Sequence, residues 1–135
     1  MIPKDCEESS KLKFMIGDAQ RELDEYLLLD FGWDGYYGEV IDKEIVNQAK
    51  SILNGFSYFF NKGKIGYPDD IIPCPSGDGT IDIKIVYDTK EIFFLFDKEF
   101  SNQIHVTRLE GERFVEERIE TKYSNLEKMF DWLVS

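Results

Sequence analysis

The stretch that decides the fold is 80-TIDIKIVYDTKEIFFLF-96. In its first half, isoleucine alternates with charged residues, which is the period of a strand that buries one face. Asp88-Thr89-Lys90 predicts a tight turn. Residues 91–96 are apolar on both faces, as in strands at the centre of a sheet. We therefore expect an antiparallel hairpin at the middle of the fold.

The strand pattern continues downstream of this hairpin. Residues 104–110 (IHVTRLE) and 113–121 (RFVEERIET) predict two further strands, joined at Glu110-Gly111. Upstream, residues 62–79 hold four Gly and three of the four Pro. That composition predicts an irregular segment with a short edge strand at Ile71–Ile72. The sheet is thus expected to be a four-stranded meander.

Helical periodicity marks both ends of the chain. Apolar residues recur at three- and four-residue steps over residues 7–29 and again from Asp42, a good N-cap, to residue 61. Ser124 and Glu127 predict a capping box at the start of a C-terminal helix. The expected fold class is α+β: two N-terminal helices, a four-stranded antiparallel meander and a C-terminal helix. We expect one domain over residues 1–135, with residues 1–6 flexible.

Charge is the strongest compositional signal. The 135 residues carry a net charge of -11, and residues 1–40 hold ten acids against four bases. Such a surface repels nucleic acids and anionic membranes and suits a basic protein partner. No apolar run approaches 18 residues, and the charged N-terminus lacks the apolar stretch of a signal peptide. We expect a cytoplasmic protein whose two cysteines, Cys6 and Cys74, are free thiols.

The connector 30-DFGWDGYYGE-39 joins the two N-terminal helices and raises the question of a ligand site. Asp30, Asp34 and Gly35 match three positions of a calcium loop, but the last ligand position is Ile41. The acids also disfavour a phosphate site, so neither metal nor cofactor is expected. The structural interpretation is a corner in which Trp33 is buried against both helices and Asp34 accepts hydrogen bonds from loop amides.

The alternative interpretation is a small ligand-binding or hydrolase-like domain with its site at this corner. That site would use Trp33, Asp34, Gly35, Tyr36 and, from the Pro/Gly-rich segment, Asp78. Outside the corner, the single histidine, His105, lies in a predicted strand without an accompanying nucleophile motif and is expected to face solvent. No catalytic set is predicted.

GWDG at residues 32–35 is the first of several motifs that follow one another in a recognisable order. A second helix follows it, then IIPCPSGDG (71–79), an Ile-rich strand and a final helix containing Asp131-Trp132-Leu133. This order resembles a group of small bacterial and phage proteins, over roughly residues 20–135. The resemblance implies no activity and no catalytic residues. Those proteins often carry a Trp late in the strand after the Asp-Gly pair, where this chain has Val86-Tyr87.

These observations favour an acidic, non-enzymatic partner protein of the antitoxin, immunity or phage anti-defence type. It would occlude a basic surface through acids on its first helix. The acids expected to do so are Glu8, Asp18, Glu22 and Glu25. A homo-oligomer that assembles through its aromatic surface is a further possibility.

Overall fold

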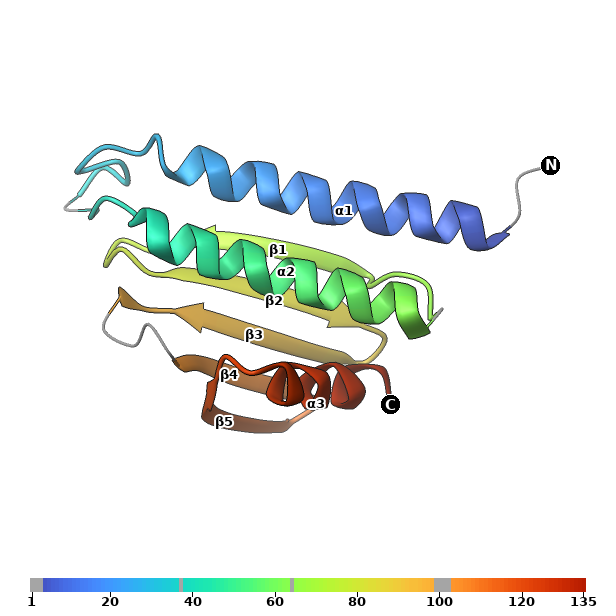
Figure 1. Ribbon diagram of the computed structural model, residues 1–135. Helices are drawn as coiled ribbons and strands as arrows, with labels where there is room; N and C mark the ends of the chain where they lie inside the picture. The colour runs from blue at the N-terminus through green and yellow to red at the C-terminus, as the bar shows by residue number, and fades with distance from the viewer. Residues whose placement is uncertain (1–3, 37, 64, 99–102) are drawn as a thin grey trace.

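The computed structural model describes residues 4–36, 38–63, 65–98 and 103–135, with side chains from Ser10 onward. Three helices and five strands follow one another in the chain (Figure 1). Their order is α1 (Lys4–Tyr26), α2 (Lys43–Gly63), β1 (Asp70–Pro75), β2 (Ile81–Tyr87), β3 (Lys90–Phe96), β4 (Gln103–Glu110), β5 (Arg113–Glu120) and α3 (Tyr123–Val134).

The strands form one antiparallel meander in the order β1-β2-β3-β4-β5, so the α+β class is confirmed and β3 is central as predicted. The sheet has five strands where the sequence predicted four. The fifth strand is β1, which contains the short edge strand predicted at Ile71–Ile72 and pairs with β2 from Asp70 opposite Val86 to Pro75 opposite Ile81. Proline is tolerated there because β1 lies at the edge of the sheet.

The outer edge of β1 is poor in hydrogen-bond donors. The Ser76 N–H donates to the Thr80 carbonyl at 2.9 Å, so residues 71, 73 and 75 point their backbone away from β2. Pro73 and Pro75 have no N–H, and the Ile71 N–H donates to Asp70 Oδ1 at 2.9 Å.

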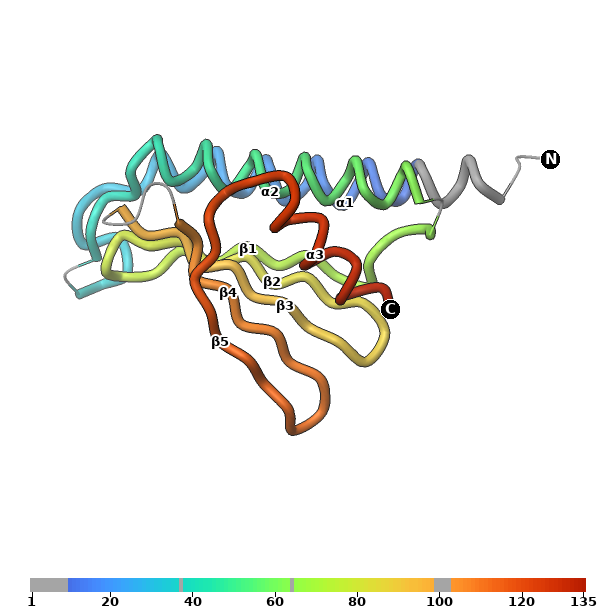
Figure 2. Tube along the Cα trace, turned by 60° about the horizontal axis from the view of Figure 1, so that its bottom comes forward, coloured from blue at the N-terminus to red at the C-terminus, as the bar shows by residue number. Residues whose placement is uncertain are grey.

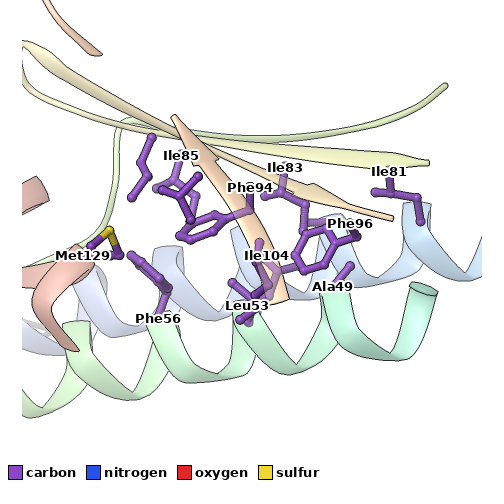
Figure 3. Close-up of a cluster of buried hydrophobic side chains, with 14 of the residues drawn as sticks. Ala49, Leu53, Phe56, Ile81, Ile83, Ile85, Phe94, Phe96, Ile104 and Met129 are labelled. Carbon is purple, nitrogen blue, oxygen red and sulfur yellow. The ribbon is translucent and has the colours of Figure 1, made fainter. Parts of the chain in front are cut away.

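All three helices cover the same face of the sheet (Figures 1 and 2). Alternate residues of β2, β3 and β4 point into the layer between helices and sheet, where they meet the apolar stripe of α2 (Figure 3). Phe56 and Phe94 are fully buried there, with ring centroids 5.3 Å apart in an edge-to-face arrangement. The opposite face of the sheet carries no helix among the described residues.

The helix boundaries test the capping predictions. Asp42 caps α2 as predicted, because its Oδ1 accepts the Glu44 N–H at 2.8 Å. The predicted capping box of α3 is wrong. The N-cap is Lys122, which makes no side-chain cap bond. Helix α1 ends at Tyr26 rather than 29, where the chain tightens into i→i−3 bonds such as Leu27 N–H to Asp24 O at 3.2 Å.

Candidate functional site

The GWDG corner is a closed loop at one end of the molecule, beside the β1–β2 turn (Figures 1 and 2). The Gly32 N–H donates to the Gly38 carbonyl at 2.7 Å and closes the ring. Gly32 and Gly35 have backbone φ angles of 79° and 83°, which residues other than glycine rarely adopt. The glycine spacing in the sequence therefore has a conformational cause.

Asp34 organises the interior of this loop. Its Oδ1 accepts the Tyr36 N–H and the Gly38 N–H, each at 2.9 Å. A Cβ added to Gly38 would lie 2.7 Å from that oxygen and 3.0 Å from Trp33 Nε1. The carboxylate and the indole thus occupy the space that only a glycine at position 38 leaves open, and Asp34 acts as the loop-capping acid that the sequence predicted.

Trp33 lies differently from the prediction. It is half-buried and is not among the residues that pack against the core. Its Nε1–H donates to the Glu39 carbonyl at 2.8 Å. This hydrogen bond crosses the loop. Because the indole is only half-buried and lies away from the core, the predicted burial between the two helices is wrong.

The corner also contacts the Pro/Gly-rich segment, about forty residues further along the chain. The Glu39 N–H donates to the Gly77 carbonyl at 2.9 Å, and a Cβ on Gly77 would meet Asp34 Oδ2 at 2.9 Å. The structure thus brings together the two motifs that the alternative interpretation combined into one site. Asp78, however, accepts hydrogen bonds from the Thr80 N–H at 3.1 Å and the Thr80 hydroxyl at 2.6 Å.

These partners limit what the corner can do chemically. The hydrogen bond from the Thr80 hydroxyl lowers the pKa of Asp78, so this carboxylate is an acceptor within its own turn. Tyr36 is 81% exposed and Gly35 has no neighbour that a Cβ would meet within 4 Å. Within the described ranges, no three His, Cys, Asp or Glu side chains come together as metal ligands. The corner is best described as a clasp between two loops.

The acids of α1 divide between two flanks of the helix. Asp24 lies on the flank that faces α2, where its Oδ1 lies 2.9 Å from Lys50 Nζ. At 100° per residue, Asp18, Glu22 and Glu25 share the opposite flank, which we call the acidic flank. Asp18 forms an ion pair with Arg21. Glu22 is half-buried and Glu25 is exposed, while the side chain of Glu8 lies outside the described part of the chain.

The acidic flank lies on the β1 side of α1, and its carboxylates affect the pKa of Tyr26. Burial, followed by the Glu22 carboxylate, raises the pKa of Tyr26 to about 12, with smaller contributions from Cys74 and Glu25. At the other end of this flank lies a hollow of about 320 Å³, lined by Ser10, Lys11, Phe14, Met15 and Tyr67, which we call the α1 notch. Phe14 is 74% exposed at its margin.

His105 lies on the open face of the sheet, half-buried, and lines two neighbouring hollows of about 240 and 380 Å³. Asp82 shares the second hollow and is half-buried. Burial, followed by the Asp78 carboxylate, raises the pKa of Asp82, and His105 opposes that shift. Neither serine nor cysteine is among the lining residues of the two hollows, and the hydroxyl that lines the second hollow is that of Thr107.

Comparison with protein-family models, with curated proteins and with solved structures finds no match to this chain. Among the residues that the structure describes, no helix is both long and apolar enough to cross a membrane.

Sequence reasoning missed one buried cation. Lys90 is 8% exposed, and its Nζ donates to the Trp132 carbonyl at 2.8 Å near the end of α3. Its place in an apparent turn sequence, Asp88-Thr89-Lys90, hid this role. The available signal was its position at the start of the most apolar strand, where a lysine needs acceptors close by.

Proposed function

We propose that this protein is a non-enzymatic binding protein that docks on a basic surface of another protein, of the antitoxin, immunity or phage anti-defence type. The net charge of -11 supports this proposal, since it favours encounter with a basic partner. We expect the protein to act in the cytoplasm, and the basic surface that it covers would be one that otherwise binds nucleic acid.

The observation that carries the proposal is the asymmetry of α1. Asp24, on the flank toward α2, is neutralised by Lys50 at 2.9 Å. On the acidic flank, Arg21 pairs with Asp18, and no ion pair is formed by Glu22 or Glu25 among the described residues. A row of carboxylates held on a rigid helix gives a basic partner a fixed target.

The α1 notch adds an apolar anchor to this row. Phe14 is exposed and the hollow beside it is lined mainly by the carbon atoms of Met15, Tyr67 and the Lys11 stem. Strong interfaces combine an apolar or aromatic centre with a charged rim. The acidic flank and the notch together provide both parts on one side of α1.

The test compares two variants with the same change in net charge. The first is Glu22→Lys/Glu25→Lys, on the acidic flank. The control is Glu112→Lys/Asp131→Lys, two exposed acids on the β4–β5 turn and on α3. Immobilised wild-type protein and both variants are used to capture proteins from the native host, and bound proteins are identified by mass spectrometry.

We expect wild type and control to retain the same basic protein and the flank variant to lose it. With that partner purified, association of the flank variant should be slower and less dependent on salt, because exposed charges act on the association rate over a Debye length of about 8 Å. Equal capture by all three proteins would assign the acids to solubility alone. Circular dichroism verifies that each variant is folded.

A further inference from the structure

The open face of the sheet is amphipathic. Alternate residues of β2 to β5 point away from the helices, and those near the middle of this face, such as Phe93 and Leu95, are half-buried although no described helix covers them. Phe114, at the β5 margin, is 63% exposed. Apolar side chains on a face that no described helix covers make that face a candidate interface.

The charges on this face follow the strand register. Two adjacent rows cross the sheet from β2 to β5. The first row is Asp82, Leu95, His105 and Arg118, and the second is Lys84, Phe93, Thr107 and Glu116. Each row therefore begins and ends with opposite charges, and the order is reversed from one row to the next.

We propose that this face binds a second copy of the chain, with a two-fold axis that runs parallel to the strands between β3 and β4. Such an axis places β2 of one copy over β5 of the other and β3 over β4. Asp82 then faces Arg118 of the second copy, and Lys84 faces Glu116 of the second copy. Each contact occurs twice, so four pairs of opposite charges flank a centre in which Leu95 faces His105 and Phe93 faces Thr107 of the second copy.

Two other simple axes are electrostatically worse. A two-fold axis perpendicular to the strands, through the second row, sets Lys84 against Lys84 and Glu116 against Glu116. An axis parallel to the strands but through β3 places Arg118 over Cys74 and Glu116 over Ile72, so neither charge faces an opposite charge of the second copy. Like charges in contact oppose association. A perpendicular axis between the two rows also joins opposite charges, Asp82 with Lys84 and Arg118 with Glu116. The mixing experiment below separates the two arrangements, because a mixture of Arg118→Glu and Asp82→Arg recovers only with the axis between β3 and β4.

The geometry of packed sheets permits these contacts. β2 and β5 lie about 7 Å from the proposed axis, from a strand spacing of about 4.8 Å. Aligned sheets cross at about 30°, which displaces facing residues at that distance by about 4 Å, within the reach of Arg and Lys side chains. The face is roughly 20 Å wide, small for a stable dimer, so we expect micromolar affinity.

Local electrostatics favour the same contact. Burial raises the pKa of Asp82, and the carboxylate of Asp78 contributes in the same direction. A guanidinium of the second copy would stabilise the ionised form of Asp82. Lys84 already pairs with Glu91 at 3.2 Å, so Glu116 of the second copy would extend that pair into a network.

Mixing two charge-reversed variants tests the proposal on the purified protein alone. Sedimentation equilibrium is measured for wild type, Arg118→Glu, Asp82→Arg and an equimolar mixture of the two variants. Each variant alone places like charges opposite each other at both contacts. We expect dimerisation at least tenfold weaker than wild type for each, and recovery in the mixture, where both contacts again join opposite charges. Native mass spectrometry with one variant labelled by ¹⁵N identifies the mixed dimer.

A control variant and a second pair of variants guard against trivial results. Arg113→Glu, a reversal on the same strand at the exposed hairpin turn, should dimerise like wild type. The pair Lys84→Glu and Glu116→Lys repeats the mixing experiment at the second row, in case Asp82→Arg fails to fold. A wild-type protein that stays monomeric at about 1 mM, reversals without effect, or a mixture no stronger than its components would overturn the proposal. None of these outcomes bears on the binding of a basic partner by α1.

Discussion

Lys90 contacts Trp132 twice: its Nζ lies 2.8 Å from the Trp132 carbonyl oxygen and 5.2 Å from the centroid of the indole ring. Arg108 approaches the same ring, with Cζ 5.5 Å from the centroid. A cation near the last carbonyls of a helix is favoured by the helix dipole, and an indole face adds a cation–π attraction. The start of β3 therefore holds the end of α3 onto the sheet.

Replacing Lys90 with Met should lower the free energy of unfolding by about 1.5–3 kcal/mol, because the Trp132 carbonyl and the Ser135 oxygens lose a charged, part-buried donor. Lys128→Met, on the exposed side of the same helix, should change it by less than about 0.5 kcal/mol. Urea denaturation followed by circular dichroism measures both. Equal midpoints for the two variants would mean that the contact contributes nothing to stability.

Two glycine-to-alanine substitutions should change the free energy of unfolding in opposite directions. Gly38→Ala places a Cβ 2.7 Å from Asp34 Oδ1, so the clasp must open, and we expect a loss of about 1–3 kcal/mol. Gly17→Ala, in an exposed position of α1 with nothing within 4 Å, should gain about 0.5–1 kcal/mol from helix propensity. Thermal unfolding compares them. A Gly38→Ala protein as stable as wild type would show that the corner tolerates rearrangement.

Asp34 offers a matched pair at the same corner. Asp34→Ala removes the acceptor for the Tyr36 and Gly38 amides and should cost about 1–2 kcal/mol. Asp34→Asn keeps an acceptor oxygen and should retain most of the stability. If both variants unfold at the wild-type temperature and Ala abolishes a binding activity, the carboxylate serves a ligand instead of the loop.

Tyr26 should be visible in an alkaline titration. Burial raises the pKa of Tyr26 to about 12, so its phenolate forms later than that of an exposed tyrosine. In the unfolded chain it ionises near 10, so between about pH 10 and 12 the folded state holds more protons and stability falls as pH rises. The absorbance difference at 295 nm between wild type and Tyr26→Phe should therefore develop near pH 12. A transition near pH 10 would place the phenol in open solvent.

The sequence predicted the elements whose signal is local. The β2–β3 hairpin follows from the two-residue alternation of Ile81, Ile83 and Ile85, which are all buried. The start of α2 follows from Asp42, whose side chain reaches only two residues along the chain. In both cases the deciding interaction lies within a few residues, along the chain, of the residue that signals it.

Features that depend on distant parts of the chain were not predictable in the same way. Of strand β1 the sequence predicted only Ile71–Ile72, because Pro73 and Pro75 argue against a longer strand until the pairing of the whole segment at the sheet edge is known. Trp33 donates to the carbonyl of Glu39, and the direction of that carbonyl is set by the folded loop. The alternating charges of the open face can be read only once the register of four strands is known.

The donor-poor edge of β1 has a consequence for the behaviour of the protein at high concentration. Fibrous polymers that grow by adding strands need an unpaired strand edge, with free N–H and C=O groups, on both sides of each subunit. Here Pro73, Pro75 and the Asp70-capped amide of Ile71 close one side. Strand addition is left with β5, and two β5 edges that pair with each other produce a finite dimer. A concentrated solution of the folded protein is therefore protected against edge-to-edge fibre growth by two prolines and one capped amide on β1.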